Sequence, residues 1–298
     1  MKADTSRWAY TQGGMQRRCM ISRMSSRLTR DCSLPSKGPG MLRFPFGKNW
    51  QAFSAVIRPS DYYKAKASLQ GLVGELDGKT FLDVGCGSGL FSAAASGLGA
   101  REVVGFDLDP VAIETARSLL EKVARWDDEI EADHVRFCVM SILDDNLGLD
   151  QFDVVYSWGV LHHTGDMYQA FERIARFVRP GGLLVLAIYN RHWTSPVWKL
   201  IKATYNWLPG LLRPLIVLPV FVSKLLVSLL VWRQNPFCRD RGMHCYYDVV
   251  DWVGGYPYEY ASLEEVIGFF GSRGFKTVKV RPTKGLTGCN EFVFARVC

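Results

Sequence analysis

The chain has 298 residues, 48% of them hydrophobic and 22% charged, which is an ordinary composition for a globular protein. This length is enough to bury a large core. The formal net charge is +7, but residues 1–50 contain ten Lys and Arg and two Asp, a net of +8, which leaves −1 for the rest. The predicted folded body therefore lacks a basic surface for phosphates, and no nucleic-acid partner is expected.

The cysteines and the start of the chain bear on the compartment. Eight cysteines are present without Cys-x-x-Cys spacing, and the first residues contain no apolar secretory segment. We interpret the cysteines as reduced thiols in an intracellular protein, not as a disulfide framework or a zinc site. No cluster of His, Cys and Asp in the sequence indicates another metal.

Residues 1–40 are rich in Arg and Ser, poor in acids and without apolar periodicity. This pattern is typical of an organellar transit segment, and equally of a disordered basic tail or of a reading frame extended upstream of a start at Met41. We exclude the segment from the fold. The predicted location is the cytoplasm, or the mitochondrion or plastid if residues 1–40 are a transit segment.

A glycine-rich turn organises the rest of the chain. The apolar run from Thr80 to Val84 predicts a buried parallel strand, Gly85, Gly87 and Gly89 follow, and the segment from Leu90 to Gly97 predicts a helix. Glycines allow a sharp turn and a close approach to a ligand, and the N-terminus of a helix presents free N–H groups. The pattern therefore predicts a site for a nucleotide-derived cofactor.

The details of this turn disfavour a dinucleotide. A dinucleotide motif has the form Gly-x-Gly-x-x-Gly, but here Leu90 occupies the place of its third glycine. Asp83 lies two residues before the first glycine, where its carboxylate would repel a pyrophosphate. A ligand that carries an amine and a sulfonium group would tolerate this charge.

The segment Asp83-Val84-Gly85-Cys86-Gly87-Ser88-Gly89 resembles the first motif of the class I S-adenosylmethionine-dependent methyltransferases. Arg179-Pro180-Gly181-Gly182, between a predicted helix and strand, resembles another recurrent feature of this class. The similarity covers about residues 42–190 and 262–298 and is greatest to the broad type 11/12 group that includes the ubiquinone-biosynthetic O-methyltransferases. It implies S-adenosylmethionine as the cofactor.

The next two strands supply further cofactor contacts. Glu102 to Asp107 predicts a strand that ends in an acid, which is the position of a ribose-binding carboxylate in such a sheet. Pro110 predicts the start of the following helix. After the strand His134 to Val139, Ser141 and Ile142 stand where the resembled family often has an acid that reaches adenine, so the adenine contact stays open.

The fourth predicted strand, Gln151 to Trp158, leads to the proton-acceptor candidates. The loop that follows contains His162 and His163, and it should face the glycine turn because ligands lie outside the carboxyl ends of parallel strands. His162 aligns with the base of some plant-type O-methyltransferases, so the resemblance implies a catalytic role. The alternative for either histidine is a packing or capping role.

The remaining core elements complete the sheet. The sequence predicts a helix from Met167 to Phe177, a strand from Leu183 to Ile188, a helix from Ser262 to Ser272, and strands from Phe275 to Arg281 and from Asn290 to Arg296. The predicted fold class is α/β, a Rossmann-like doubly wound seven-stranded sheet with a C-terminal antiparallel hairpin and a helical cap insertion.

The insertion between Tyr189 and Tyr260 is apolar. Residues 208–232 are interrupted by Pro209, Pro214 and Pro219, and the uncharged runs are shorter than the roughly 20 residues that a spanning helix needs. By this criterion we do not predict a transmembrane helix, although the segment from Pro214 to Trp232, with one central Lys, is borderline. The alternatives are a cap over a lipophilic substrate, peripheral contact with a membrane, and a purely structural insertion.

Residues 248–260 mix aromatic, acidic and glycine residues, and we predict a loop that binds substrate. Its candidate residues are Trp252, Tyr256 and Tyr258. The predicted domains are residues 1–40, a cofactor-binding core at 41–190, the cap and substrate-side loop at 191–260, and the C-terminal helix and hairpin at 261–298.

The sequence thus predicts a methyltransferase that acts on a small, lipophilic acceptor, at a hydroxyl oxygen, with His162 or His163 as the base. The alternatives are an RNA methyltransferase that uses the basic N-terminal tail, and a non-catalytic cofactor-binding or membrane-associated protein. The predicted cofactor-binding residues are Asp83, Gly85, Cys86, Gly87, Ser88, Gly89, Asp107, Leu108, Ser141, Ile142, Ser157 and Trp158.

Overall fold

The structure is a computed structural model that describes residues 43–231, 233, 244–283 and 288–297. The predictions made for residues 1–40 lie outside these residues.

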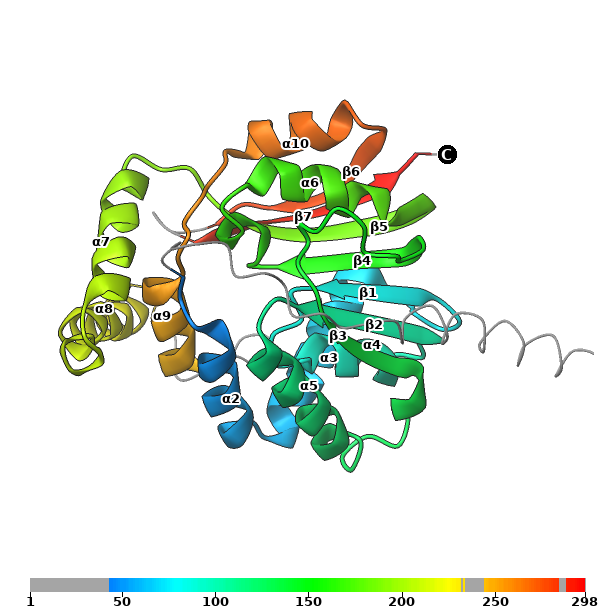
Figure 1. The fold of residues 1–298 in the computed structure, drawn as a ribbon, viewed down its shortest axis with the longest axis horizontal. Coiled ribbons are helices and arrows are strands. Elements are labelled where there is room, and N and C mark those ends of the chain that lie inside the picture. The colour runs from blue at the N-terminus through cyan, green and yellow to red at the C-terminus, as the bar shows by residue number, and fades with distance from the viewer. Residues whose placement is uncertain (1–42, 232, 234–243, 284–287, 298) are drawn as a thin grey trace, which may run out of the picture.

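A seven-stranded mixed sheet forms the centre of the molecule, in the order β3-β2-β1-β4-β5-β7-β6 (Figure 1). Strands β1 to β5 are parallel, while β7 pairs antiparallel with both β5 and β6. The predicted α/β fold with a C-terminal hairpin is confirmed. The strands are β1 (Thr80–Val84), β2 (Glu102–Asp107), β3 (Val135–Val139), β4 (Phe152–Trp158), β5 (Val178–Tyr189), β6 (Phe275–Arg281) and β7 (Cys289–Arg296).

Helices cover both faces of the sheet (Figure 1). Within the described residues they are α2 (Phe46–Val56), α3 (Pro59–Val73), α4 (Leu90–Gly97), α5 (Pro110–Val123), α6 (Met167–Arg176), α7 (Ser195–Trp207), α8 (Pro214–Leu226), α9 (Cys245–Gly254) and α10 (Leu263–Gly271). Short 3-10 turns lie at η1 (Ala132–His134), η2 (Leu161–His163) and η3 (Gly210–Leu212), and a π-helical turn at η4 (Val227–Val231).

The alternation of side chains along each strand divides the core in two. Phe81 packs with α3, α4 and α5 on one face of the sheet, whereas its neighbour Leu82 packs with α6 and α10 on the other. Successive side chains of a strand point to opposite faces, so a parallel strand covered on both faces is apolar throughout. This explains why β1 is buried along its whole length.

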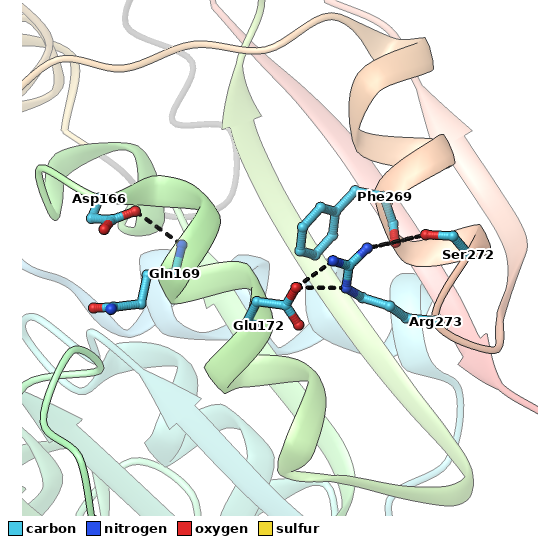
Figure 2. Close-up of polar contacts among 6 residues, drawn as sticks. All are labelled: Asp166, Gln169, Glu172, Phe269, Ser272 and Arg273. Carbon is cyan, nitrogen blue, oxygen red and sulfur yellow. Dashed lines mark hydrogen bonds and ion pairs between the residues drawn. The ribbon is translucent and has the colours of Figure 1, made fainter.

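Helices α6 and α10 are joined at the surface by a polar contact (Figure 2). The Arg273 side chain donates from Nε to Glu172 Oε1 at 2.9 Å, and its guanidinium lies 3.6 Å from the centroid of the Phe269 ring. Asp166 caps α6 by accepting the Gln169 N–H at 3.0 Å. Since the ion pair is exposed, it orients the two helices more than it stabilises them.

Two local predictions were wrong. Arg179 to Gly182 does not separate the helix from the strand: the segment lies inside β5 as a bulge, because Phe152 pairs with Val178 while Val154 pairs with Leu183. Of the loop predicted at residues 248–260, residues 248–254 belong instead to α9, because Val249 and Val253 bury an apolar stripe. The aromatic segment before Trp50, for which no helix or strand was predicted, begins α2.

The glycine at the start of α4 is required by packing as well as by backbone geometry. Gly89 has φ +74°, and a Cβ there would lie 2.7 Å from Ala116 Cβ and 3.0 Å from Phe137 Cζ. Gly74 has a similar φ of +72°, but a Cβ there would meet nothing within 4 Å. Substituting alanine at each position therefore distinguishes the cost of backbone strain, which both share, from the cost of steric overlap, which only Gly89 would incur.

We expect Gly89→Ala to destabilise the protein by about 1–3 kcal/mol more than Gly74→Ala, because only the first substitution also overpacks the core. Urea unfolding of both variants and the parent measures the difference. Equal losses of unfolding free energy would show that α4 can move away from α5 at little cost.

Candidate functional site

The candidate site lies at the carboxyl ends of β1, β2 and β4. The order of the strands in the sheet reverses here, between β1 and β4. Strands β1 and β4 are neighbours, but α4 after β1 packs on one face of the sheet and α6 after β4 packs on the other. Loops that diverge in this way leave the strand ends between them uncovered, which is where ligands bind in open α/β sheets.

The glycine turn is held against the end of β2. The N–H groups of Gly85 and Cys86 both donate to the Phe106 carbonyl, at 2.8 and 3.0 Å, and the Gly89 N–H donates to the Cys86 carbonyl at 2.8 Å. A Cβ at Gly85 would lie 2.4 Å from Val160 Cγ1. The turn therefore lies close to the loop that follows β4, and only glycine permits this approach.

Asp107 lies beside this turn at the end of β2. Its Oδ2 accepts the Gly87 N–H at 3.0 Å, and its Oδ1 accepts the Asp109 N–H at 2.9 Å. Burial raises the pKa of Asp107 to about 6, although these hydrogen bonds oppose the shift. A carboxylate has about four acceptor positions, so Asp107 retains capacity for a hydroxyl donor from a ligand.

Asp83 is buried at the end of β1 and accepts a hydrogen bond from the Ser92 hydroxyl at 2.6 Å. Burial, together with the charge of Asp107, raises its pKa to about 7. Neither carboxylate forms an ion pair within the part of the chain that the structure describes. Two mutually repelling, buried acids favour a ligand that brings positive charge.

The other predicted cofactor residues differ in how far they are buried. Leu108 and Ser141 are partly exposed next to Asp107, and the Ser141 hydroxyl accepts the Leu143 N–H at 3.1 Å. Trp158 stacks on Tyr156, with ring centroids 5.8 Å apart. Those that lie inside the protein are Cys86, Ser88, Gly89, Ile142 and Ser157.

Two of these buried residues have structural partners. The Ser157 hydroxyl donates to the Val84 carbonyl at 3.0 Å and so joins β4 to the end of β1. Ile142 packs in the core with Leu82 and Val84. Their contacts shape the strand ends on which the site is built.

Helix α2 covers the glycine turn, which the sequence did not indicate. The Trp50 ring would lie 2.9 Å from a Cβ at Gly87, and the Gly47 N–H donates to Asp109 Oδ2 at 2.9 Å. Asn49 donates to the Tyr247 carbonyl at 3.2 Å and reaches Asp251 Oδ1 at 3.4 Å. The aromatic spacing of Phe46, Trp50 and Phe53 is the signal that could have revealed this helix.

The two adjacent histidines have opposite tautomers. The Tyr189 N–H donates to His162 Nδ1 at 3.2 Å, so Nε2 carries the hydrogen, and this buried Nε2 has no partner among the described residues. His163 Nδ1 lies 2.6 Å from the Pro257 carbonyl, which only accepts, so Nδ1 carries the hydrogen and Nε2 holds the lone pair. His162 Nε2 is therefore a donor, and His163 Nε2 an acceptor.

Both imidazoles are neutral near pH 7. Burial lowers the pKa of His162 well below its ordinary value and that of His163 to about 3, and the nearby Lys202 charge adds to both effects. The His163 ring lies 5.1 Å from the Phe46 ring and 5.4 Å from the Tyr189 ring. A Cβ at Gly255 would lie 2.8 Å from His163 Nε2, so this glycine makes room for the imidazole.

Lys202 of α7 is a buried residue that sequence reasoning missed. Its ammonium donates to the Trp252 carbonyl and lies 4.8–5.0 Å from the ring centroids of Tyr189, Trp252 and Tyr258. Burial lowers the pKa of Lys202 to about 7 and raises that of nearby Asp251 to about 7. A lysine within an apolar sequence run is the signal that could have drawn attention to it.

The predicted substrate residues surround this lysine to different degrees. Tyr258 is buried and its ring lies 5.1 Å from Tyr189, whereas Trp252 is half-buried and packs against Trp198 with centroids 4.1 Å apart. Tyr256 is half-buried, and its carbonyl accepts the Phe44 N–H at 3.1 Å. Trp252 and Tyr258 thus share Lys202 as a common contact.

The strand order, the glycine turn and the acid at the end of β2 define a class I S-adenosylmethionine-dependent methyltransferase. Residues 60–252, more than half of the chain, match the family described as "Methyltransferase domain", and the chain belongs to it. The chain thus carries a domain of the S-adenosylmethionine-dependent methyltransferases. The cationic cofactor fits the paired carboxylates Asp83 and Asp107, which lack a cation of their own within the described residues.

Known relatives match the core over part of their length. The chain is 32% identical over 136 residues to a "Ubiquinone biosynthesis O-methyltransferase" of Rhodopseudomonas palustris, which covers 45% of this chain and 50% of the relative. A protein of the same description from Alkalilimnicola ehrlichii is 32% identical over 133 residues, 45% of this chain and 51% of the relative. The chain thus spans about half the length of the curated relatives it matches.

Solved structures resemble the chain at low identity. Magnesium protoporphyrin IX methyltransferase from Synechocystis with bound SAH is 16% identical, with a TM-score of 0.49, over 95% of this chain and 99% of that one. An S-adenosylmethionine-dependent methyltransferase from Mesorhizobium loti is 17% identical, with a TM-score of 0.48, over 77% and 96% of the two chains.

We expect Asp107→Asn to weaken S-adenosylmethionine binding by about 1.5–3 kcal/mol, or roughly tenfold to a hundredfold, because hydrogen bonds to a charged group are lost. In the parent, affinity should rise from pH 5 to pH 7 as this acid, whose pKa is about 6, loses its proton. Asp107→Asn should lack this rise of affinity with pH. Calorimetric titration measures both effects.

The matched control is Asp77→Asn, which removes an exposed carboxylate before β1, at the opposite end of that strand from the site. This variant should bind as the parent does. If Asp107→Asn also bound with the parent's affinity and pH dependence, Asp107 would have no part in holding the cofactor.

We expect the stability that Lys202 contributes to increase with pH. Its pKa falls from 10.5 to about 7 on folding, so between these values the unfolded chain holds a proton that the folded chain does not. The unfolding free energy of the parent relative to Lys202→Met, and with it the melting temperature, should therefore rise from pH 7 to pH 10, by about 1.4 kcal/mol for each pH unit.

Thermal unfolding of the two proteins over this pH range measures the effect, with Lys199→Met as the control. Lys199 lies exposed on the same helix, so its removal should give a curve parallel to that of the parent. A Lys202→Met curve parallel to the parent would mean that the ammonium is not desolvated in the folded protein.

Proposed function

We propose that the protein transfers a methyl group to a hydroxyl oxygen of a small, lipophilic acceptor. The observation that carries this proposal is the neutral His163 imidazole. Its Nδ1 is committed to the Pro257 carbonyl, which leaves the lone pair on Nε2. The ring lies among Phe46, His162 and Tyr189, at the end of β4 that adjoins the glycine turn.

S-adenosylmethionine, when bound, supplies an electrophilic methyl group. Asp107 would hold the ribose hydroxyls, Asp83 would face the amine side, and the backbone of Gly85 and Gly87 would line the methionine and ribose moieties. His163 Nε2 takes the proton of the acceptor hydroxyl, while His162 Nε2–H donates to an acceptor atom. Such positioning contributes up to roughly 7–11 kcal/mol in well-oriented systems.

The lipophilic character of the acceptor is inferred from the aromatic surroundings of the histidines. Tyr189 and Tyr258 are buried beside them, and Trp252 packs on the same lysine. The relatives are described as O-methyltransferases of ubiquinone biosynthesis, which supports an oxygen acceptor on an apolar molecule. Among hydroxyl groups a phenol loses its proton most readily, with a pKa of about 10, so it demands the least of the base.

RNA is the alternative acceptor, with residues 1–40 as its basic handle. A protein that starts at Met41 separates the two proposals. It should keep full activity on a phenolic acceptor and bind no RNA if the small-molecule proposal is correct. An intracellular location, in the cytoplasm or an organelle, is part of the same proposal.

We expect His163→Asn to lower the rate of methyl transfer by roughly 10²–10⁴-fold, which is the usual contribution of a general base. The asparagine amide takes the place of Nδ1 and can still donate to the Pro257 carbonyl, so the fold and the affinity for S-adenosylmethionine should be retained. Transfer of a radiolabelled methyl group to a panel of phenols, alcohols, carboxylates and amines measures the rate and identifies the acceptor.

His162→Asn is the matched control, because its amide oxygen takes the place of Nδ1 and can still accept the Tyr189 N–H. Its rate should fall far less than that of His163→Asn. The reverse order would assign the proton acceptor to His162, and methylation of amines alone would contradict an oxygen acceptor.

A further inference from the structure

Helices α7 and α8 lie on one side of the molecule, away from the sheet (Figure 1). They and the adjoining turns expose large apolar side chains. The most exposed of these are Leu211, Trp207 and Trp193, which are 89%, 79% and 78% exposed. Leu200, Leu215 and Leu218 extend this apolar surface along α7 and α8. Monomeric soluble proteins rarely expose so many large apolar side chains together, so this surface calls for a partner.

The helical segment Gly210–Leu230 dominates this surface. It has 21 residues, a mean hydropathy of 1.9 and only 6% of its most apolar window buried, so by length and composition it could cross a membrane. The sequence criterion, which required an uncharged run of roughly 20 residues, therefore excluded a segment that is long and apolar enough to span a membrane. A core helix with this hydropathy would be buried, and this segment is not near the N-terminus, where signal sequences lie.

The contacts of α8 show how the segment is held. Val217 is buried against Phe44, Val249 and Val253, and Lys224 Nζ lies 2.5 Å from Asp248 Oδ2 of α9. Leu215 and Leu218 project on the other side and are exposed. Spanning a bilayer would break the packing of α8 on α9, whereas lying flat in its interface would keep it.

The charge of this region is one-sided. From Arg191 to Arg239 the sequence contains seven Lys and Arg and no Asp or Glu. Of these, Lys202 is buried, and Arg191 and Lys224 form ion pairs with acids outside the stretch. Lys199 and Arg233 are exposed among the described residues of this stretch. Trp193 and Trp207 bring amphipathic rings of the kind that favour the headgroup level of a membrane. The charge and the apolar face together match an anionic lipid surface.

We propose that the exposed face of α7 and of Gly210–Leu230 docks on the surface of a bilayer that contains anionic lipid. The helices lie in the interface, with the leucines inserted among the acyl chains and the basic residues at the headgroups. This surface is distinct from the cofactor-binding end of the sheet, and its test does not depend on methyl transfer.

The experiment is flotation of the full chain with vesicles of phosphatidylcholine and phosphatidylglycerol, beside vesicles of phosphatidylcholine alone. We expect binding to the anionic vesicles, weaker binding to the neutral ones, and loss of the difference at high salt. The double variant Leu211→Asn/Leu215→Asn should bind the anionic vesicles at least about tenfold more weakly, since two inserted side chains are removed.

The matched control is Val278→Asn/Val297→Asn, which alters two aliphatic side chains that are similarly exposed, on β6 and after β7. It should bind as the parent does. Both variants should keep the melting temperature of the parent, because none of the four side chains is buried.

Three results would overturn the proposal. The first is a parent that stays in solution with both kinds of vesicle, or that binds no more tightly than the leucine variant. The second is a lipid-free parent that sediments as a dimer which the leucine variant dissociates, because the face would then bind a second copy. The third is resistance of the bound protein to alkaline carbonate extraction, because the segment would then span the bilayer.

Discussion

The Phe106 carbonyl is the contact on which the site depends. It accepts the N–H groups of both Gly85 and Cys86, and so ties the turn after β1 to the end of β2. This contact brings Asp83 and Asp107 close enough that the charge of Asp107 raises the pKa of Asp83. Two acids buried together are unfavourable by themselves, and a cationic cofactor relieves the repulsion. The site is therefore built to favour the sulfonium and ammonium groups of S-adenosylmethionine.

Helix α2 joins the cofactor site to the insertion. Trp50 lies over Gly87, Phe46 lies beside His163, and Asn49 bonds to the Tyr247 carbonyl and reaches Asp251 on α9. One helix therefore contacts the glycine turn, the candidate base and the insertion. Displacing α2 would therefore disturb both the glycine turn and the surroundings of His163.

One side of the insertion packs beside the candidate site, and the other side is exposed to solvent. On the inner side Lys202 lies within an aromatic group formed by Tyr189, Trp252 and Tyr258, beside the two histidines. On the outer side the leucines of η3 and α8 are exposed. A lipophilic acceptor and a lipid surface would both meet the same small group of helices, which places substrate supply next to the chemistry.

The sequence by itself determined the sheet, the glycine turn and the acid at the end of β2. These features follow from local rules: strands buried on both faces are continuously apolar, and Gly85 and Gly89 have positive φ, which disfavours other residues. The strands β1 and β2 were predicted to the residue. The helical parts of the insertion were harder, because the apolar stripe of α9 is mixed with aromatic, acidic and glycine residues that are typical of loops.

Only the tertiary structure decided the roles of neighbouring residues. His162 and His163 are identical in the sequence, but the Tyr189 N–H and the Pro257 carbonyl, 27 and 94 positions away, give them opposite tautomers. Lys202 becomes a desolvated cation only because α7 packs its side chain against α9 and Tyr258. A proton's position and a pKa depend on partners that are distant in the chain, so no local pattern could specify them.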